Sequence, residues 1–136
     1  MLEPEEVSEW IKKAENDYAG ALHIHRRRKK PLPDLVCFHC QQAAEKYLKA
    51  FLIFKEVSFP KIHDLLALLE LCQRHRSDFE LWREPFELLN PYSVQLRYPG
   101  EEASVEEARV AVQAVKQIRT FMRSCVPREQ WPAAEE

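Results

Sequence analysis

Glycine is scarce in this sequence, which contains only Gly20 and Gly100 among its 136 residues but has nine prolines. The phosphate-binding loops of P-loop and Rossmann folds need at least two glycines a few residues apart, and these two are widely separated. Sheets with many tight turns also depend on glycine, because it adopts positive φ angles without a steric penalty. The sequence therefore excludes the glycine-rich phosphate-binding motifs and predicts helices joined by loops that contain proline.

Length and composition predict a single globular domain. With 46% hydrophobic and 31% charged residues, the chain is long enough to bury a core without disulfides or structural metals. The N-terminal segment MLEPEEVSEW is acidic and has no apolar signal region, and no stretch approaches the ~18 apolar residues of a membrane span. We therefore expect a cytoplasmic protein with reduced cysteines and no membrane contact.

Hydrophobic periodicity predicts an all-α fold. Apolar residues recur at helical spacing in three long segments and two shorter ones. The expected helices cover about residues 5–30, 35–56, 63–76 and 78–90, with a last helix that follows Ser104 and ends near Cys125. This pattern predicts an up-and-down antiparallel bundle of four to five helices over residues 1–125. Residues 126–136 have little to pack against and are expected to form a disordered C-terminal tail.

Polar residues mark the expected starts of three helices. Asp34 and Asp64 precede the second and third predicted helices, and aspartate at such a position accepts hydrogen bonds from free backbone N–H groups. Ser104 and Glu107 match the capping box S-x-x-E. We therefore expect all three helices to have side-chain caps.

The predicted helix over about 35–56 is apolar over roughly 200° of its circumference, counted at 100° per residue, and is expected to be central. Its remaining polar strip, about 80° wide, consists of His39, Gln42, Lys46 and Lys49. Lysines on such a helix need solvent, a partner or an anion. The polar strip is therefore either a ligand site or a solvent-facing edge on which Glu45 and Lys49 form an i,i+4 pair.

Other polar groups also have a structural and a functional interpretation. The cationic run at residues 26–30 either complements a helix dipole or binds phosphates, and we favour the dipole because no aromatic residues interleave the run. Cys37 and Cys40 form a C-x-x-C, but no second ligand pair completes a zinc site. No histidine has a glutamate three residues before it, as a di-metal bundle requires. We therefore expect no metal and no other cofactor.

Four blocks of the sequence resemble the small prokaryotic HEPN domains. Residues 37–50, CFHCQQAAEKYLKA, resemble the signature of the second helix of that family. The other blocks are Ala14-Glu15-Asn16-Asp17-Tyr18, His63-Asp64-Leu65 and Arg97-Tyr98-Pro99. Their order and spacing extend over about residues 8–125, which is nearly the whole chain.

The resemblance implies an all-α bundle that forms homodimers and has a nucleotide- or RNA-linked role. It also implies a minimal nucleotidyltransferase as partner, in a toxin–antitoxin-like pair. Carried over to this sequence, the polar residues of the nucleotide-binding type of member are Gln42, Glu45, Lys46, Lys49, His63, Arg97 and Tyr98. The three cations are expected to contact phosphates. Tyr98 would stack on a base, and His63 would hydrogen-bond a ribose or phosphate.

The sequence departs from the family in one respect. Ribonucleases of the family carry an Arg followed after four to six residues by a His on the last long helix. Here that segment has Arg109, Arg119 and Arg123 but no histidine, and the last histidine of the chain is His75. Because acid–base cleavage of RNA at neutral pH usually needs an imidazole, we expect no catalysis by the usual family site.

Three hypotheses remain from the sequence. The first is a non-catalytic, homodimeric module that binds a nucleotide or a nucleotidyltransferase partner. The second is an atypical ribonuclease toxin in which His39 or His63 is the base and Arg97 stabilises the phosphorane. The third is a purely structural dimerisation bundle whose polar strip forms the interface.

Overall fold

The computed structural model describes residues 4–94 and 98–133, and in this part of the chain every regular element is helical. The long helices are α1 (Pro4–His25), α2 (Pro33–Phe54) and α5 (Val105–Cys125). Between α2 and α5 lie the shorter α3 (Leu65–Gln73) and α4 (Arg83–Leu89). Three 3₁₀ segments cover Ser77–Trp82, Asn90–Tyr92 and Arg128–Gln130. The all-α bundle expected from the sequence is confirmed.

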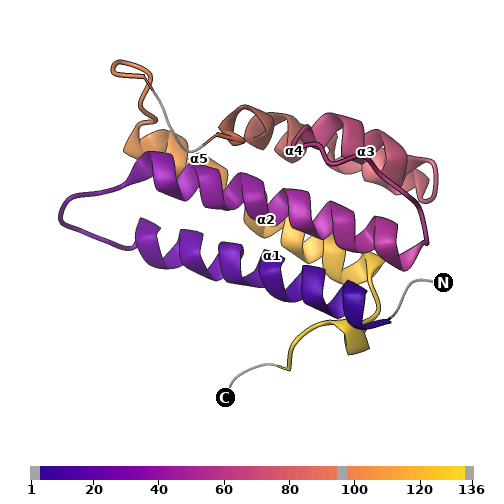
Figure 1. The fold of residues 1–136 in the computed structure, drawn as a ribbon. Coiled ribbons are helices and arrows are strands. Elements are labelled where there is room, and N and C mark those ends of the chain that lie inside the picture. The colour runs from indigo at the N-terminus through magenta and orange to yellow at the C-terminus, as the bar shows by residue number, and fades with distance from the viewer. Residues whose placement is uncertain (1–3, 95–97, 134–136) are drawn as a thin grey trace.

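Helix α2 lies at the centre of the bundle, as its broad apolar surface predicts. It packs against α1, α5, α3 and α4, and Figure 1 shows α1 beside it, α5 behind it, and the α3–α4 pair on its other side. Helix α5 runs antiparallel to α1 and in the same direction as α2 (Figure 1). The core between them includes fully buried Tyr47, Phe51, Phe79, Phe86 and Ile118.

Two of the three expected caps form. The side chain of Asp64 accepts hydrogen bonds from the N–H groups of Leu66 and Ala67 at the start of α3. Ser104 and Glu107 form the complete capping box of α5. The expected N-cap at Asp34 is wrong, because α2 begins earlier, with Pro33 in its first turn, where the fixed φ of proline favours a helix start. Asp34 Oδ1 instead accepts from the Ala103 N–H at 2.6 Å.

Three helices are shorter than expected, and the shortening of α3 to Leu65–Gln73 accompanies that of α1 and α4. Helix α1 ends at His25, and residues 26–30 are exposed and form no helix. Five consecutive cations repel each other, and Pro31 disfavours a helical Lys30, which adopts a positive φ of 52°. Residues 77–82 form a 3₁₀ segment before α4, because Pro85 is tolerated only within the first turn of an α-helix.

The expected disordered tail is wrong for residues 126–131. Val126 and Trp131 are buried, and the Trp131 ring stacks on Tyr47 with ring centres 5.6 Å apart. The Trp131 indole N–H donates to the Val126 carbonyl, and the Ser8 hydroxyl donates to Gln130 at 2.7 Å. The position of this segment after the last helix does not indicate its packing. The large Trp131 side chain is buried against Tyr47, which lies far away in the chain.

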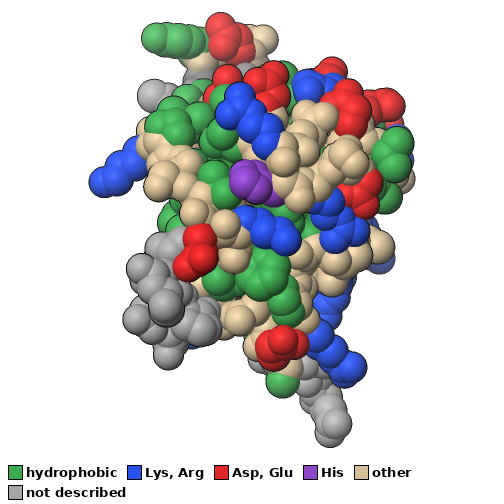
Figure 2. Space-filling model, turned by 90° about the vertical axis from the view of Figure 1, so that its right-hand side faces the viewer, with side chains coloured by type: hydrophobic (Ala, Val, Ile, Leu, Met, Phe, Trp, Pro, Cys, Tyr) green, Lys and Arg blue, Asp and Glu red, His purple; other side chains and the backbone are tan. Residues whose placement is uncertain are grey.

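The surface carries charges of both signs. Figure 2 views the molecule from the right-hand side of Figure 1 and shows Lys and Arg side chains around a histidine, with carboxylates mainly toward the edge of the face. The formal net charge of −2 therefore does not prevent local concentrations of cations. None of the helices in the described chain is long and apolar enough to cross a bilayer.

Candidate functional site

The first half of the polar strip is bound to α1 through one carboxylate. Asp17 on α1 accepts a hydrogen bond from Lys46 at 2.5 Å through Oδ2. Its other oxygen lies 2.8 Å from Nδ1 of His39. The Asp17 side chain is only 13% exposed, so this pair forms a partly buried link between α1 and α2.

The second half of the polar strip is organised by Glu45, whose side chain is 4% exposed. Glu45 Oε2 accepts from Lys49 Nζ at 3.0 Å, and Oε1 lies 2.9 Å from Nδ1 of His63. Gln41, which is fully buried, donates to the His63 carbonyl at 3.1 Å. Lys49 also lies over the Trp10 ring, 5.6 Å from its centre. The expected Glu45–Lys49 pair therefore exists, but it is buried and does not form a solvent-facing edge.

The seven predicted site residues are not all brought together. Glu45, Lys49 and His63 share one network, and Gln42 joins it by donating to Gln41 at 2.8 Å. Lys46 faces α1 instead. Tyr98 is 76% exposed, in the turn that its carbonyl forms with the Glu101 N–H. Arg97 lies outside the described residues.

A separate groove, which we call the α1–α5 groove, follows the contact between those two helices and has a volume of about 560 Å³. This volume lies within the range of small-molecule sites, roughly 300–1,000 Å³. Its charged lining residues are Lys12, Glu15, Arg26, Arg119 and Arg123. Among the described lining residues, four cations and one carboxylate give a net charge of three positive charges.

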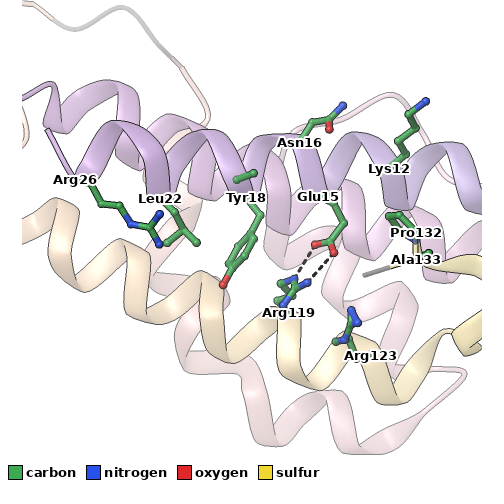
Figure 3. A pocket seen from close by; sticks show the side chains of 11 residues that line it. Lys12, Glu15, Asn16, Tyr18, Leu22, Arg26, Arg119, Arg123, Pro132 and Ala133 are labelled. Atoms are coloured by element: carbon green, nitrogen blue, oxygen red, sulfur yellow. Dashed lines mark hydrogen bonds and ion pairs between the residues drawn. The ribbon is translucent and has the colours of Figure 1, made fainter. Parts of the chain in front are cut away.

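Side chains follow one another along the α1–α5 groove in a fixed order. Figure 3 shows Arg26, Leu22 and Tyr18 toward one end, the Glu15–Arg119 pair in the middle, and Arg123 toward the other. Lys12 extends from the α1 rim at that second end, near Pro132 and Ala133 (Figure 3). Arg26 therefore lies at one end, whereas Arg119, Arg123 and Lys12 lie from the middle of the groove to the other end.

Arg119 is held in place by Glu15. Its Nε and Nη2 donate to the two carboxylate oxygens at 2.7 and 2.8 Å, and its guanidinium lies 4.7 Å from the centre of the Tyr18 ring. A guanidinium has five N–H donors, so two-point binding to Glu15 leaves three. Arg119 thus combines a fixed orientation with free donors, an arrangement suited to an anion.

The buried partner of this pair is Tyr47, whose hydroxyl donates to Glu15 at 2.5 Å. Burial alone would raise the pKa of Glu15, but hydrogen bonds from Arg119 and Tyr47 and the nearby positive charge lower it below its usual value. The pKa of Tyr47 is raised, first by burial and then by the Glu15 charge. Hydrogen bonding to Glu15 raises the pKa of Arg119. The pair is therefore ionised at neutral pH.

The other groove cations are not paired with a carboxylate among the described side chains. Within residues 6–94 and 98–133, no carboxylate oxygen lies within 4.0 Å of Lys12, Arg26 or Arg123. Arg123 lies over the Trp131 ring, with its guanidinium carbon 4.8 Å from the ring centre. Among the described residues, these cations differ in this respect from Lys46 and Lys49, each of which is bound by a carboxylate.

The cysteines offer no ligand site. Cys37, Cys40, Cys72 and Cys125 are all buried, and none of them forms a disulfide. Burial raises the pKa of Cys40 and Cys72 above its usual range, and raises that of Cys125 to about 11. Protonated, buried thiols are poor nucleophiles and poor metal ligands.

Sequence reasoning missed the α1–α5 groove. In the sequence, Arg119 and Arg123 were considered only as arginines that no histidine follows at the family spacing. Glu15 was considered only as part of the block at residues 14–18. One-turn spacing places Arg119 and Arg123 on one face of α5, and Tyr18 and Leu22 have the same spacing on α1. Those two pairs were the available signal, but nothing local indicates that the two faces meet.

Comparison with known proteins identifies the fold family. The model of the HEPN domain matches residues 7–125. The chain belongs to the HEPN family. An archaeal HEPN homologue of known crystal structure is similar to it, with a TM-score of 0.64, 22% identity, and coverage of 87% of this chain and 95% of that one. At this identity the similarity concerns the fold. None of the curated proteins compared with the chain matches it.

HEPN domains are a nucleotide- and RNA-related family, and they commonly form dimers. The match extends from α1 to the end of α5, so it contains the polar strip and the groove residues contributed by those two helices, whereas Pro132 and Ala133 follow it in the chain.

Proposed function

We propose that this chain is a non-catalytic, homodimeric HEPN module that binds the phosphates of a nucleotide or RNA in the α1–α5 groove. The observation that carries the proposal is the excess of three positive charges among the residues lining that groove. Exposed cations of this kind attract phosphates with little dependence on sequence.

The polar strip is a weaker candidate for phosphate binding. Asp17 binds Lys46, and Glu45 binds Lys49, so each lysine already has its counter-ion. A phosphate would have to displace a partly or fully buried carboxylate, and the displaced charge would lose its partner. The contacts to phosphate first expected of Lys46 and Lys49 therefore pass in this proposal to Arg123, which has no such counter-ion among the described residues, and to the three N–H donors of Arg119 that Glu15 does not bind.

The absence of catalysis rests on the chemistry of α5. That helix carries Arg109, Arg119 and Arg123 and no histidine, which is the side chain that usually acts as the acid or base in RNA cleavage at neutral pH. We further propose that the module works beside a minimal nucleotidyltransferase, so that ligand binding in this chain is coupled to a catalytic partner.

The decisive test measures binding of a fluorescently labelled single-stranded RNA and of a labelled nucleotide by anisotropy. Arg123→Ala is expected to weaken binding by about tenfold or more, the value of one charge-assisted hydrogen bond. For RNA the salt slope should also become shallower by about 0.7. The matched control is Arg109→Ala, because Arg109 is exposed on the same helix and pairs with Glu106.

Lys46→Ala separates this proposal from the original prediction. Binding that survives Lys46→Ala and is lost in Arg123→Ala supports the α1–α5 groove. Loss in Lys46→Ala alone would return the site to the polar strip, and unchanged binding in both variants would contradict both assignments.

One observation favours the ribonuclease alternative. His63 is 68% exposed, and buried Glu45 lies at its Nδ1. If Nδ1 donates to this carboxylate, Nε2 is left as an acceptor, which is the state of a general base. Purified protein and a His63→Ala variant should then digest RNA at different rates. Equal rates, or no digestion by either protein, would remove His63 from catalysis, and a His39→Ala variant tests the second histidine in the same assay.

A further inference from the structure

The two ends of the α1–α5 groove differ in charge. Lys12, Arg119, Arg123 and Glu15 lie toward the C-terminal segment, and together they leave two positive charges there. Of the described lining residues, Arg26 is the only charged one toward the other end (Figure 3). From Glu15 to Arg26 the chain advances about 16 Å at the helical rise per residue. The cations are therefore concentrated at one end rather than spaced evenly.

The cationic end is also the end at which the C-terminal segment lies. Pro132 and Ala133 line the groove there, between α1 and α5 (Figure 3). They follow Trp131, which is fixed by its stacking on Tyr47, and Gln130, which is bound to Ser8. An anchored segment in this position obstructs a strand that would continue past Arg123.

Between the two ends the lining is less polar. Tyr18 and Leu22 come from successive turns of α1, and Arg119 lies against the Tyr18 ring. An aromatic ring with a guanidinium beside it is a surface on which a base or ribose can pack. Along the groove, a cationic end is thus followed by the apolar surface of Tyr18 and Leu22 and then by the single cation Arg26.

A terminal phosphate fits this arrangement better than an internal one. A phosphate monoester carries a charge of about −1.5 to −2 at pH 7, whereas each phosphodiester along a strand carries one negative charge. Two positive charges at an obstructed end match the monoester in both charge and position. An evenly cationic groove open at both ends would suit a continuous strand instead.

We infer that the α1–α5 groove recognises a nucleotide through a terminal phosphate monoester, held by Arg119 and Arg123 beside Pro132 and Ala133, with the nucleoside on Tyr18 and Leu22. This inference rests on the proposed function and specifies its ligand. The same chemistry occurs at the end of an RNA strand and in a free mononucleotide. Arg26 distinguishes the two sources, because only a strand extends far enough to reach it.

The test compares one short single-stranded RNA in 5′-phosphorylated, 3′-phosphorylated and unphosphorylated forms, together with adenosine 5′-monophosphate. The expected result is about tenfold tighter binding of one phosphorylated end than of the unphosphorylated strand. Arg123→Ala should abolish this difference, whereas Arg109→Ala should preserve it. Arg26→Ala should weaken the strand but leave adenosine 5′-monophosphate unchanged.

Each other outcome has a definite meaning. Equal binding of phosphorylated and unphosphorylated strands would overturn the inference and leave the proposed function intact. No binding of any probe would overturn the proposed function itself. A preference for the phosphorylated end that survives Arg123→Ala would overturn the assignment of the terminal phosphate to this end of the groove.

Discussion

The polar strip and the α1–α5 groove contain similar cations in different surroundings. In the polar strip, Lys46 and Lys49 each lie within hydrogen-bond distance of a carboxylate, and Lys49 is buried. In the groove, no carboxylate oxygen of the described side chains lies within 4.0 Å of Arg123. The comparison suggests that nearby carboxylates decide whether a cation stabilises the fold or remains available to a ligand. Substitutions in the polar strip should therefore change stability, and substitutions at the free groove cations should change binding.

The largest effect is expected at Glu45. Glu45→Ala leaves the buried Lys49 ammonium without its counter-ion and should lower the free energy of unfolding by about 3–5 kcal/mol. Urea denaturation measures this change. The double variant Glu45→Ala, Lys49→Met removes the uncompensated charge and should recover much of the loss. A loss below about 1 kcal/mol in Glu45→Ala would contradict the structural role given to the polar strip.

Asp17 should show a smaller effect of the same kind. Asp17→Ala removes the acceptor shared by His39 and Lys46, at an expected cost of about 1–3 kcal/mol. The cost is lower than at Glu45 because the two partner side chains are 27% and 23% exposed and can reach water. A greater loss of unfolding free energy in Asp17→Ala than in Glu45→Ala, measured by urea denaturation, would show that burial does not determine which carboxylate contributes more to stability.

Glu15 lines the groove, but it is paired with Arg119 as the carboxylates of the polar strip are paired with their lysines. We therefore expect its substitution to change stability, as in the polar strip. Glu15→Gln weakens two-point binding to Arg119 and should cost about 1–2 kcal/mol at neutral pH. The pKa of Glu15 is lower in the folded protein than its ordinary 4.5. Its contribution is therefore complete above pH 4.5 and is lost as the pH falls through the lower folded pKa.

The pH dependence can be measured directly. Urea denaturation of the wild type and of Glu15→Gln between neutral and acidic pH should give two stabilities that converge as the pH falls. A stability difference that stays constant with pH would mean that the carboxylate charge is not what Arg119 recognises.

The smallest effect on stability is expected at Arg123. Arg123→Ala removes a cation that lies over Trp131 at the surface, and should cost less than about 1 kcal/mol. The same variant should lose most ligand affinity. A large loss of stability without loss of binding would reverse the assignment of the two regions.

Local chemistry made most of the fold predictable. Apolar spacing predicted the helices, and short-range capping patterns predicted Asp64 and Ser104 as N-caps. The errors arose where a distant residue decides the outcome. Asp34 binds the N–H of Ala103, and Trp131 packs on Tyr47. Neither partner can be found from local spacing.

The candidate site was less predictable for the same reason. The family resemblance indicated Lys46 and Lys49 as phosphate contacts, but Asp17 and the buried Glu45 already bind these two side chains. The i,i+4 spacing indicated the Glu45–Lys49 pair, although not its burial. The α1–α5 groove depends on Glu15 and Arg119, which are 104 residues apart in the chain.

The position of these groove residues in the chain also bears on how the protein folds. Helices α1 and α2 are consecutive and pack along one another, so their contacts close a short loop at low entropic cost. The Glu15–Arg119 pair and the Ser8–Gln130 hydrogen bond join opposite ends of the sequence. During synthesis the groove cannot form until α5 and Trp131 have left the ribosome. A nascent or C-terminally truncated chain would have the α1–α2 pair but no ligand site.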